Sequence, residues 1–193
     1  MATKKRIDRM VRILKNRQID LSVVCENIHD PHNVSAILRS CDAVGVHNVS
    51  LLYTNEEFPK LGKKSSASAK KWININNFTN KFELKNYLKS VNLSIYATYI
   101  DKEAISVFDI DWTKPSAIIV GNEHRGITED LLDITDQKIF IPMFGMIESL
   151  NVSVATAVIL YEAARQRIAK GMYPNPKLTE DWIKKILGEW SDK

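Results

Sequence analysis

Short runs of apolar residues alternate with helical patterns through most of the chain, from Leu21 to about Lys170. The apolar runs occupy Leu21–Ile28, Asn48–Tyr53, Leu93–Ile100, Ser116–Asn122 and Gln137–Pro142. Helical patterns follow at His32–Val44, Asn80–Ser90, Thr128–Ile134 and Ser149–Lys170. Strands without apolar–polar alternation, separated by helices, are typical of a parallel sheet covered on both faces. The pattern therefore predicts an α/β fold with a mostly parallel sheet and helices on both faces.

The last of these helices carries one continuous apolar stripe. Its members recur at helical spacing and are Leu150, Val154, Ala157, Val158, Tyr161, Ala164 and Ile168. We expect this stripe to face either the core or a second subunit.

A further amphipathic helix is predicted near the end of the chain. Gly171 ends the long helix, Pro174 and Pro176 prevent its continuation, and Thr179 is a suitable cap for the next one. The new helix has an apolar stripe with two tryptophans, formed by Trp182, Ile183, Ile186, Leu187 and Trp190. Because such a stripe needs a surface to cover, it is expected to pack on the core, on the N-terminal helix or on a second subunit.

The first 17 residues hold an excess of positive charge, with seven basic side chains and one acidic side chain, whereas the whole chain has a formal net charge of only +4. Ile7, Met10, Val11 and Leu14 recur there at helical spacing, which predicts a short amphipathic helix. Both a solvated surface helix and a contact with a polyanion fit this composition. No Trp or Phe lies on the apolar face, so a membrane-surface helix is less favoured.

Composition favours one folded domain with extensions. The chain has 193 residues, of which 45% are hydrophobic and 26% charged, and no apolar run approaches the length of a membrane span. The N-terminus lacks the apolar region of a signal peptide, which predicts a cytoplasmic protein. Cys25 and Cys41 form no pair motif, so we expect two buried, unreactive thiols rather than a disulfide or zinc framework.

Common nucleotide and metal motifs are absent from the sequence. It contains no G-x-G-x-x-G, no G-x-x-x-x-G-K-[ST], no H-E-x-x-H and no G-x-S-x-G. Pro31 breaks helical geometry between His29 and His32, and no further ligands cluster with them, so no metal site is expected. The polar stretch Thr54–Lys71 is expected to be a long surface loop.

Three polar clusters each follow a predicted strand. The first contains Asn33 and Arg39, the second is G-N-E-H-R-G from Gly121 to Gly126, and the third contains Ser149, Asn151 and Ser153 at the opening of a helix. Each cluster alone has a structural explanation, as helix caps, a surface arginine or a polar turn. Ligands of open α/β sheets bind at the carboxyl ends of strands, so the coincidence of three clusters favours a site.

The residue sequences of these three clusters are specific. N-x-S-A-I-x-R-S, G-N-E-x-x-G and I-P-M-x-G…S-L-N-V-S resemble the three motifs of the SPOUT-class RNA 2′-O-ribose methyltransferases, over roughly residues 20–170. The resemblance implies a deep trefoil knot in the C-terminal part of the α/β domain. It also implies a basic helical extension over 1–19, the methyltransferase domain over 20–170 and a C-terminal helical extension over 171–193.

The short extensions are similar to those of class members that methylate the ribose of guanosine 18 in the tRNA D loop. This likeness implies transfer of a methyl group from S-adenosylmethionine to a 2′-hydroxyl of tRNA, without a metal, by a cytoplasmic homodimer. Two alternatives stay open: the same chemistry on another tRNA or ribosomal RNA ribose, and a non-catalytic RNA-binding module.

The resemblance also assigns residues to roles. Those expected to hold the cofactor are Thr98, Gly121, Ile141, Met143 and Leu150. Those expected at the catalytic pocket are Arg39, its supporting Asn33, the acidic Glu123, and Ser149 with Asn151. RNA contacts are expected from Lys4, Lys5, Arg6, Arg9, Arg12, Lys63, Lys64 and Arg125. A protonated guanidinium has no acceptor, so Arg39 acts either as a perturbed base or by electrostatic stabilisation of the forming alkoxide.

Overall fold

Seven parallel strands form one sheet in the computed structural model, which describes residues 3–59, 69–191 and 193. The strands are β1 (Gln18–Glu26), β2 (Val46–Leu52), β3 (Asn74–Phe78), β4 (Ser94–Thr98), β5 (Ile105–Ser106), β6 (Ser116–Val120) and β7 (Gln137–Phe140). Their order is β3-β2-β1-β6-β4-β7-β5, and every neighbouring pair is parallel. The predicted α/β fold with a parallel sheet is confirmed.

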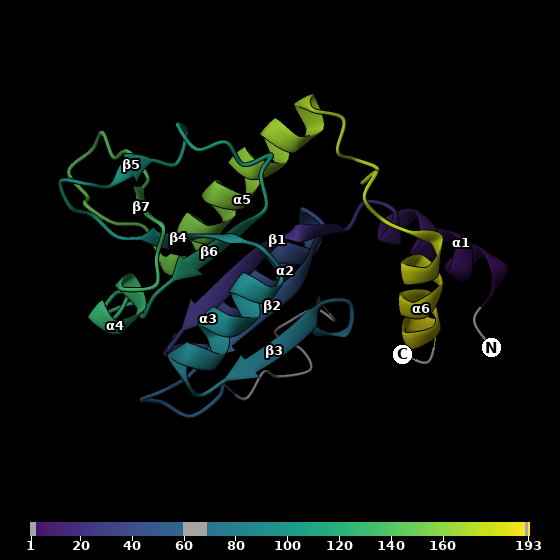
Figure 1. Ribbon diagram of the computed structural model, residues 1–193, viewed down its shortest axis with the longest axis horizontal. Coiled ribbons are helices and arrows are strands. Elements are labelled where there is room, and N and C mark those ends of the chain that lie inside the picture. The colour runs from purple at the N-terminus through teal and green to yellow at the C-terminus, as the bar shows by residue number, and fades with distance from the viewer. Residues whose placement is uncertain (1–2, 60–68, 192) are drawn as a thin grey trace.

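Helices cover both faces of this sheet (Figure 1). On one face lie α2 (Pro31–Ala43) and α5 (Val152–Ala169), which share a core cluster with Val23 and Cys25 of β1. On the other lie α3 (Lys81–Ser90) and α4 (Glu129–Leu132), which share a second cluster with Val24. Consecutive side chains of a strand point to opposite faces. The apolar run of β1 therefore supplies both cores, as its lack of alternation predicts.

Two strands, β3 and β5, are not predicted by the apolar pattern. Both lie at the edges of the sheet. In β3, the exposed Asn74 and Asn77 break up any apolar run, and β5 is only two residues long. Edge strands bury little surface, so they leave a weak hydrophobic signal.

The apolar stripe of α5 faces the core only in part. Val154, Tyr161 and Ile168 are 48%, 59% and 64% exposed, whereas Ile159 and Leu160 are fully buried. Ala164 of the same stripe is buried in the core cluster, so the stripe is divided between the core and the surface. The helix is apolar on more than one face, so periodicity alone could not identify the side that contacts the sheet.

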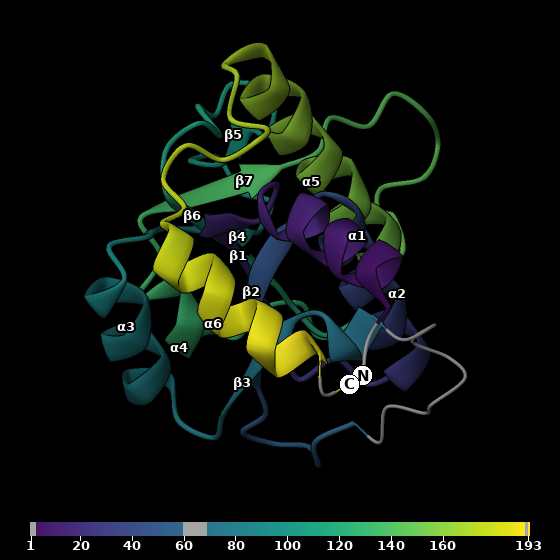
Figure 2. The same ribbon diagram turned by 90° about the vertical axis from the view of Figure 1, so that its right-hand side faces the viewer.

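The helices α1 (Lys4–Leu14) and α6 (Glu180–Ser191) pack against each other near the two ends of the chain (Figure 2). Met10 and Leu14 meet Ile186 and Trp190 in an apolar cluster of their own. The tryptophan stripe thus packs on the N-terminal helix, one of the three surfaces considered, and Trp182 also contacts the buried His47 of β2. Thr179 caps α6 as predicted, since its hydroxyl oxygen accepts a hydrogen bond of 3.2 Å from the Trp182 amide.

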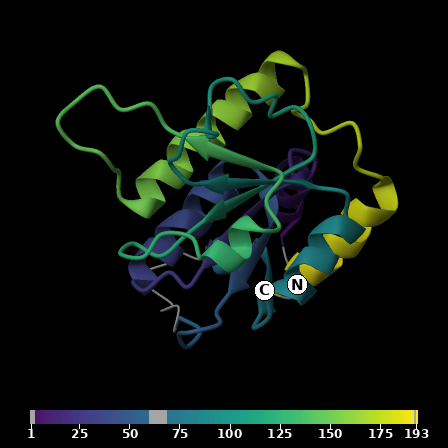
Figure 3. The ribbon, with the colours of Figure 1, turned by 60° about the vertical axis from the view of Figure 1, so that its left-hand side comes forward.

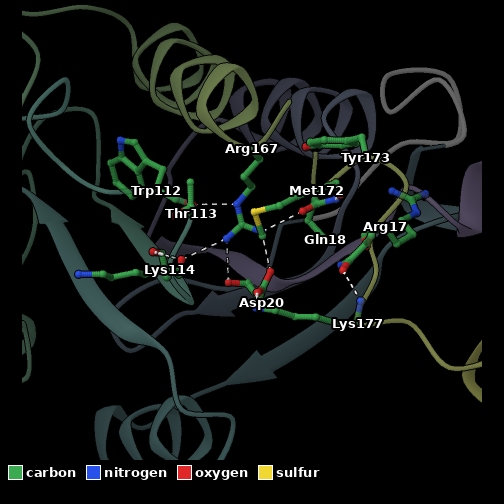
Figure 4. Close-up of polar contacts among 12 residues, drawn as sticks. Arg17, Gln18, Asp20, Trp112, Thr113, Lys114, Arg167, Met172, Tyr173 and Lys177 are labelled. Carbon is green, nitrogen blue, oxygen red and sulfur yellow. Dashed lines mark hydrogen bonds and ion pairs between the residues drawn. The ribbon is translucent and has the colours of Figure 1, made fainter. Parts of the chain in front are cut away.

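Asp20 of β1 ties both the end of α5 and the chain beyond it to the sheet (Figure 4). Arg167 is fully buried and donates hydrogen bonds to Asp20 at 2.5 Å and Gln18 at 2.9 Å. Lys177 also pairs with Asp20 at 2.5 Å. Burial raises the pKa of Asp20, but the hydrogen bonds from Lys177 and Arg167 outweigh this and lower it overall. The ionised carboxylate thus anchors the segment that leads to α6.

Both cysteines are buried and free, as expected. Burial raises the pKa of Cys25 to about 12 and that of Cys41 well above its usual value, so neither thiol is reactive near neutral pH. Lys63 and Lys64, with half of the predicted surface loop (60–68), lie outside the described residues, and the loop ends in the short helix η1 (Ala69–Lys71). Within the described ranges, no helix is long and apolar enough to cross a membrane.

Candidate active site

A cavity of about 420 Å³ opens at the carboxyl ends of β4, β6 and β7. All five residues predicted to hold a cofactor line it: Thr98, Gly121, Ile141, Met143 and Leu150. Three of the predicted catalytic residues, Glu123, Ser149 and Asn151, line the same cavity. The fold thus brings together segments from the second and third polar clusters with the end of β4.

Gly121 begins the loop that presents the second cluster. A Cβ atom there would lie 2.4 Å from the carbonyl carbon of Gly126, so no other residue fits without moving the backbone. Gly126 has φ of +68°, which favours glycine, and its backbone pairs with that of Asn122 through bonds of 3.0 and 2.9 Å. The two glycines therefore close a tight loop that leaves Glu123, His124 and Arg125 at its tip.

The remaining wall comes from the long segment between β7 and α5, which projects from the body of the molecule (Figure 3). Met143, Glu148 and Leu150 line the cavity from this segment. Farther along the same loop, Phe144 and Met146 are 97% and 99% exposed. Large apolar side chains held in solvent mark a surface that is available to another partner.

Glu123 is the centre of a hydrogen-bond network that joins all three clusters. Its carboxylate accepts bonds from the Asn33 side chain at 2.7 Å and from the backbone amides of His29 at 2.9 Å and Asp30 at 3.3 Å. Asn151 in turn donates to the Asn33 side-chain oxygen at 3.1 Å. Burial raises the pKa of Glu123, but these donors outweigh burial and hold it below its usual value. The network therefore keeps an ionised carboxylate at the cavity wall.

The start of α5 differs from the sequence prediction. The helix begins at Val152, and Asn151 caps it by accepting a bond of 2.9 Å from the Ser153 amide. Ser149 lies before the helix, in the cavity wall, rather than in its opening turn. Asn151 accordingly serves both as the cap of α5 and as the donor that holds Asn33.

Arg39 stands apart from the cavity in this structure. It lies on α2, six residues beyond Asn33 and thus about 9 Å farther along the helix axis. Its side chain is exposed and, in the part of the chain that the structure describes, has no hydrogen bond or ion pair. The guanidinium is therefore free to meet a ligand outside the cofactor cavity.

Glu56 is a site residue that sequence reasoning missed. Its carboxylate contacts the guanidinium of Arg125, accepts a weak bond from the Asn122 side chain at 3.4 Å and lies 3.4 Å from Nδ1 of His29. Arg125, predicted to contact RNA, is thus paired rather than free. Glu56 belongs to a polar loop distant in sequence from every motif, so no pattern could have identified it.

The five basic residues predicted on the N-terminal helix are all exposed on α1: Lys4, Lys5, Arg6, Arg9 and Arg12. Among the described residues no carboxylate forms an ion pair with any of them. Because α1 leads into the amino end of β1, these charges lie at the opposite end of the sheet from the cavity.

Candidate metal ligands do not gather anywhere in the described ranges. No group of three or more His, Cys, Asp or Glu side chains there is arranged to hold a metal ion. His29 and His124 approach each other only to 6.5 Å between ring centres.

Residues 20–161 match the SpoU rRNA Methylase family. The chain is 41% identical to the tRNA (guanosine(18)-2′-O)-methyltransferase of Aquifex aeolicus (strain VF5) over 191 residues, which are 99% of this chain and 90% of that protein. The fold of this chain matches the crystal structure of the A. aeolicus TrmH/SpoU tRNA modifying enzyme. The TM-score is 0.91 and the identity 42%, and the match covers 98% of this chain and 96% of the other.

A more distant likeness is the SpoU methyltransferase AviRb from Streptomyces viridochromogenes, solved in complex with the cofactor AdoMet. The TM-score is 0.70 at 26% identity, and the match covers 79% of this chain and 60% of AviRb. These findings confirm the resemblance carried by the three sequence motifs. The match extends over most of the chain and includes the whole cavity, and the chain belongs to the SpoU rRNA Methylase family.

Proposed function

We propose that the protein transfers a methyl group from S-adenosylmethionine to the ribose 2′-hydroxyl of guanosine 18 in the D loop of tRNA. The observation that carries this proposal is the convergence of the motif residues on one cavity, joined by the Asn33–Glu123–Asn151 network. Support for tRNA as the substrate comes from the A. aeolicus relative, which matches this chain over nearly its full length.

The cavity suits S-adenosylmethionine. Its volume of about 420 Å³ lies in the range of small-molecule sites, and apolar Val120, Ile139 and Leu150 provide walls for an adenine ring. At Gly121 the backbone lies so close to Gly126 that there is no room for a side chain. The backbone groups of Gly121 are therefore the ones available to bind the cofactor. When bound, S-adenosylmethionine supplies a methyl group activated by its positively charged sulfur. The ionised Glu123 provides a negative charge at the wall, which favours a cationic ligand.

On the acceptor side, Arg39 is the residue we assign to the reacting hydroxyl. Its unpaired guanidinium can hold a substrate phosphate and stabilise negative charge on the 2′-oxygen as the hydroxyl proton passes to solvent water. Asn33, at the start of the same helix, is fixed by Glu123 and Asn151, so the network orients α2 relative to the cavity. Ser149, which forms part of the cavity wall, is assigned to the catalytic pocket with Asn151.

The proposed assembly is a homodimer with a knotted core. The exposed apolar residues of α5, Val154, Tyr161 and Ile168, together with Phe144 and Met146, offer a surface for a second copy. The order of β1, β6, β4 and β7 in the sheet is compatible with a trefoil knot in which the β7–α5 segment takes part. A monomer in sedimentation experiments at micromolar concentration would contradict the dimer.

The proposed organisation divides the chain into 1–19, 20–170 and 171–193, with the separate α1–α6 cluster as support. The unpaired basic residues of α1 contact tRNA phosphates, and Lys63, Lys64 and Arg125 extend this surface. Arg125 does so only when an RNA phosphate displaces Glu56. The reaction needs no metal and takes place in the cytoplasm, where the proposed substrate is found. Activity that is lost with chelator and restored by a divalent ion would contradict the metal-free mechanism.

The test of function is ribose-methylation mapping of RNA from cells that lack the gene. Loss of 2′-O-methylation at guanosine 18 of tRNA supports the proposal. Loss at another tRNA or ribosomal RNA position would instead identify a related enzyme, and an unchanged map would favour a non-catalytic RNA-binding module.

A further inference from the structure

A second cavity, of about 410 Å³, lies between α1, η1 and α6. Its lining includes Arg6, Arg9, Arg17, Asp42, Trp72 and Trp190, and it shares no residue with the cofactor cavity. Figure 2 shows α1 and α6 side by side. The cavity lies at the amino end of β1, whereas the cofactor cavity lies at the carboxyl ends of the strands. It is therefore a separate site.

The mouth of this cavity is positively charged. Asp42 is the acidic residue of its lining, and its carboxylate already pairs with Arg17 at 2.5 Å. Arg6 and Arg9 are exposed and form no ion pair with any described residue. Two guanidinium groups are thus left for an anionic ligand. Each guanidinium can form two parallel hydrogen bonds to the oxygens of one phosphate.

The floor of the cavity is aromatic and held in place by a buried arginine. The rings of Trp72 and Trp190 lie 5.0 Å apart in an edge-to-face arrangement. The fully buried Arg17 places its guanidinium carbon 5.1 Å from the centre of the Trp190 ring and donates to the Trp72 carbonyl at 3.2 Å. Its buried Nε has no hydrogen-bond partner in the described part of the chain, so the floor retains one unsatisfied donor. Trp72 remains partly exposed, which leaves ring surface for a ligand.

We propose that this cavity binds one unstacked nucleotide of the tRNA, with its phosphate between Arg6 and Arg9 and its base against Trp72. This inference rests on the proposed contact of α1 with tRNA. Free cationic groups beside an ordered aromatic ring are the combination by which proteins hold single-stranded nucleotides. An acidic peptide would use the charges but not the aromatic floor. The cavity is a binding site remote from the chemistry, and Arg17 is a positioning residue for the two tryptophans.

The experiment measures tRNA affinity of the full chain as a function of salt. For R6Q/R9Q we expect the slope of log affinity against log salt to fall by about 0.7–0.9 for each lost phosphate contact. For W72L we expect an unchanged slope but a loss of affinity of about 5- to 150-fold at every salt concentration, the range of a lost base stack. W72F retains a ring and should recover most of the affinity.

W182L is the matched control, because Trp182 lies in the same α1–α6 cluster but packs against His47 rather than lining the cavity. It should bind tRNA like the unmodified protein. Calorimetric titration with S-adenosylmethionine checks that each variant is folded.

The outcomes separate the two proposals. An unchanged salt slope in R6Q/R9Q would contradict the α1 contact itself. A reduced slope there, with W72L binding as tightly as the unmodified protein or no more weakly than W182L, would overturn only the nucleotide pocket. If W72L does not fold, tryptophan fluorescence of the unmodified protein decides: quenching by a uridine hexanucleotide that is lost in R6Q/R9Q supports the pocket, and no quenching overturns it.

Discussion

The side-chain amide of Asn33 donates a hydrogen bond of 2.7 Å to the carboxylate of Glu123, although 90 positions of sequence separate them. Asn33 lies in the first turn of α2, and Glu123 lies in the loop after β6. Because β1 and β6 are neighbouring parallel strands, the segments that follow them meet at the carboxyl ends of the strands. This bond connects the helix that carries Arg39 to the wall of the cofactor cavity.

Replacing Asn33 by Asp should lower turnover on tRNA on the order of 100-fold while leaving cofactor affinity nearly unchanged, because two carboxylates would then face each other across that bond. Steady-state kinetics and calorimetry measure the two effects. The double variant N33D/E123Q restores one amide–carboxylate pair and should recover part of the turnover. Equal activity of N33D and the unmodified protein would show that the bond has no role in positioning.

Replacing Arg39 by Ala should reduce turnover about 10³-fold or more, since the guanidinium is assigned to charge stabilisation at the acceptor oxygen. Affinity for S-adenosylmethionine should stay the same, because Arg39 does not line the cofactor cavity. R39K keeps the charge without the planar fork and should recover only a fraction of the activity. A collapse of cofactor affinity in R39A would contradict this division of roles.

Gly121→Ala should abolish cofactor binding, because the added methyl carbon would collide with the Gly126 backbone at 2.4 Å and displace the loop. Gly145→Ala is the control within another loop of the same region, where an added Cβ meets no atom within 4 Å. Calorimetric titration with S-adenosylmethionine compares the two. Normal binding by G121A would mean that the loop can move without affecting the site.

His47 should make the fold less stable in acid. Burial lowers its pKa from 6.5 to about 4, with Arg17 and Lys193 adding to the effect. The unfolded chain therefore binds a proton at higher pH than the folded one, so the stability present above pH 6.5 is lost as the pH falls toward 4. From pH 7 to pH 5 this group should lower the free energy of unfolding by about 2 kcal/mol.

Urea unfolding of the unmodified protein and of H47Q at both pH values measures this contribution. The difference between the two proteins is the relevant quantity, because burial raises the pKa of Glu26 and shifts stability in the opposite direction. The same pH dependence in both proteins would exclude His47 as the cause.

The sequence was a good guide to the buried strands and a poor one to buried charge. The fully buried β6, Ser116–Val120, appears as an uninterrupted apolar run and is easily predicted. Arg17 and Arg167 are also fully buried, yet they have the composition of surface residues. Their burial depends on Asp42 and Asp20, which lie 25 and 147 positions away, and local patterns carry no information about such partners.

The candidate site shows the same division. The family resemblance assigns Thr98, Gly121 and Leu150 to a cofactor, and the fold brings them to one cavity. The sequence does not assign Glu56 to the site, because its contacts with Arg125 and His29 depend on the path of the polar loop that follows β2. A local sequence pattern predicts helices, strands and motif residues, whereas contacts between side chains far apart in the sequence depend on the complete fold.

Methyl transfer to a tRNA that lacks only the ribose 2′-oxygen of guanosine 18 tests most directly which atom accepts the methyl group. Purified protein is incubated with labelled S-adenosylmethionine and either an unmodified tRNA transcript or the same tRNA with 2′-deoxyguanosine at position 18. We predict one methyl group incorporated per unmodified tRNA and none in the deoxy substrate. Equal incorporation into both would contradict the account, because the acceptor would then not be the ribose of guanosine 18.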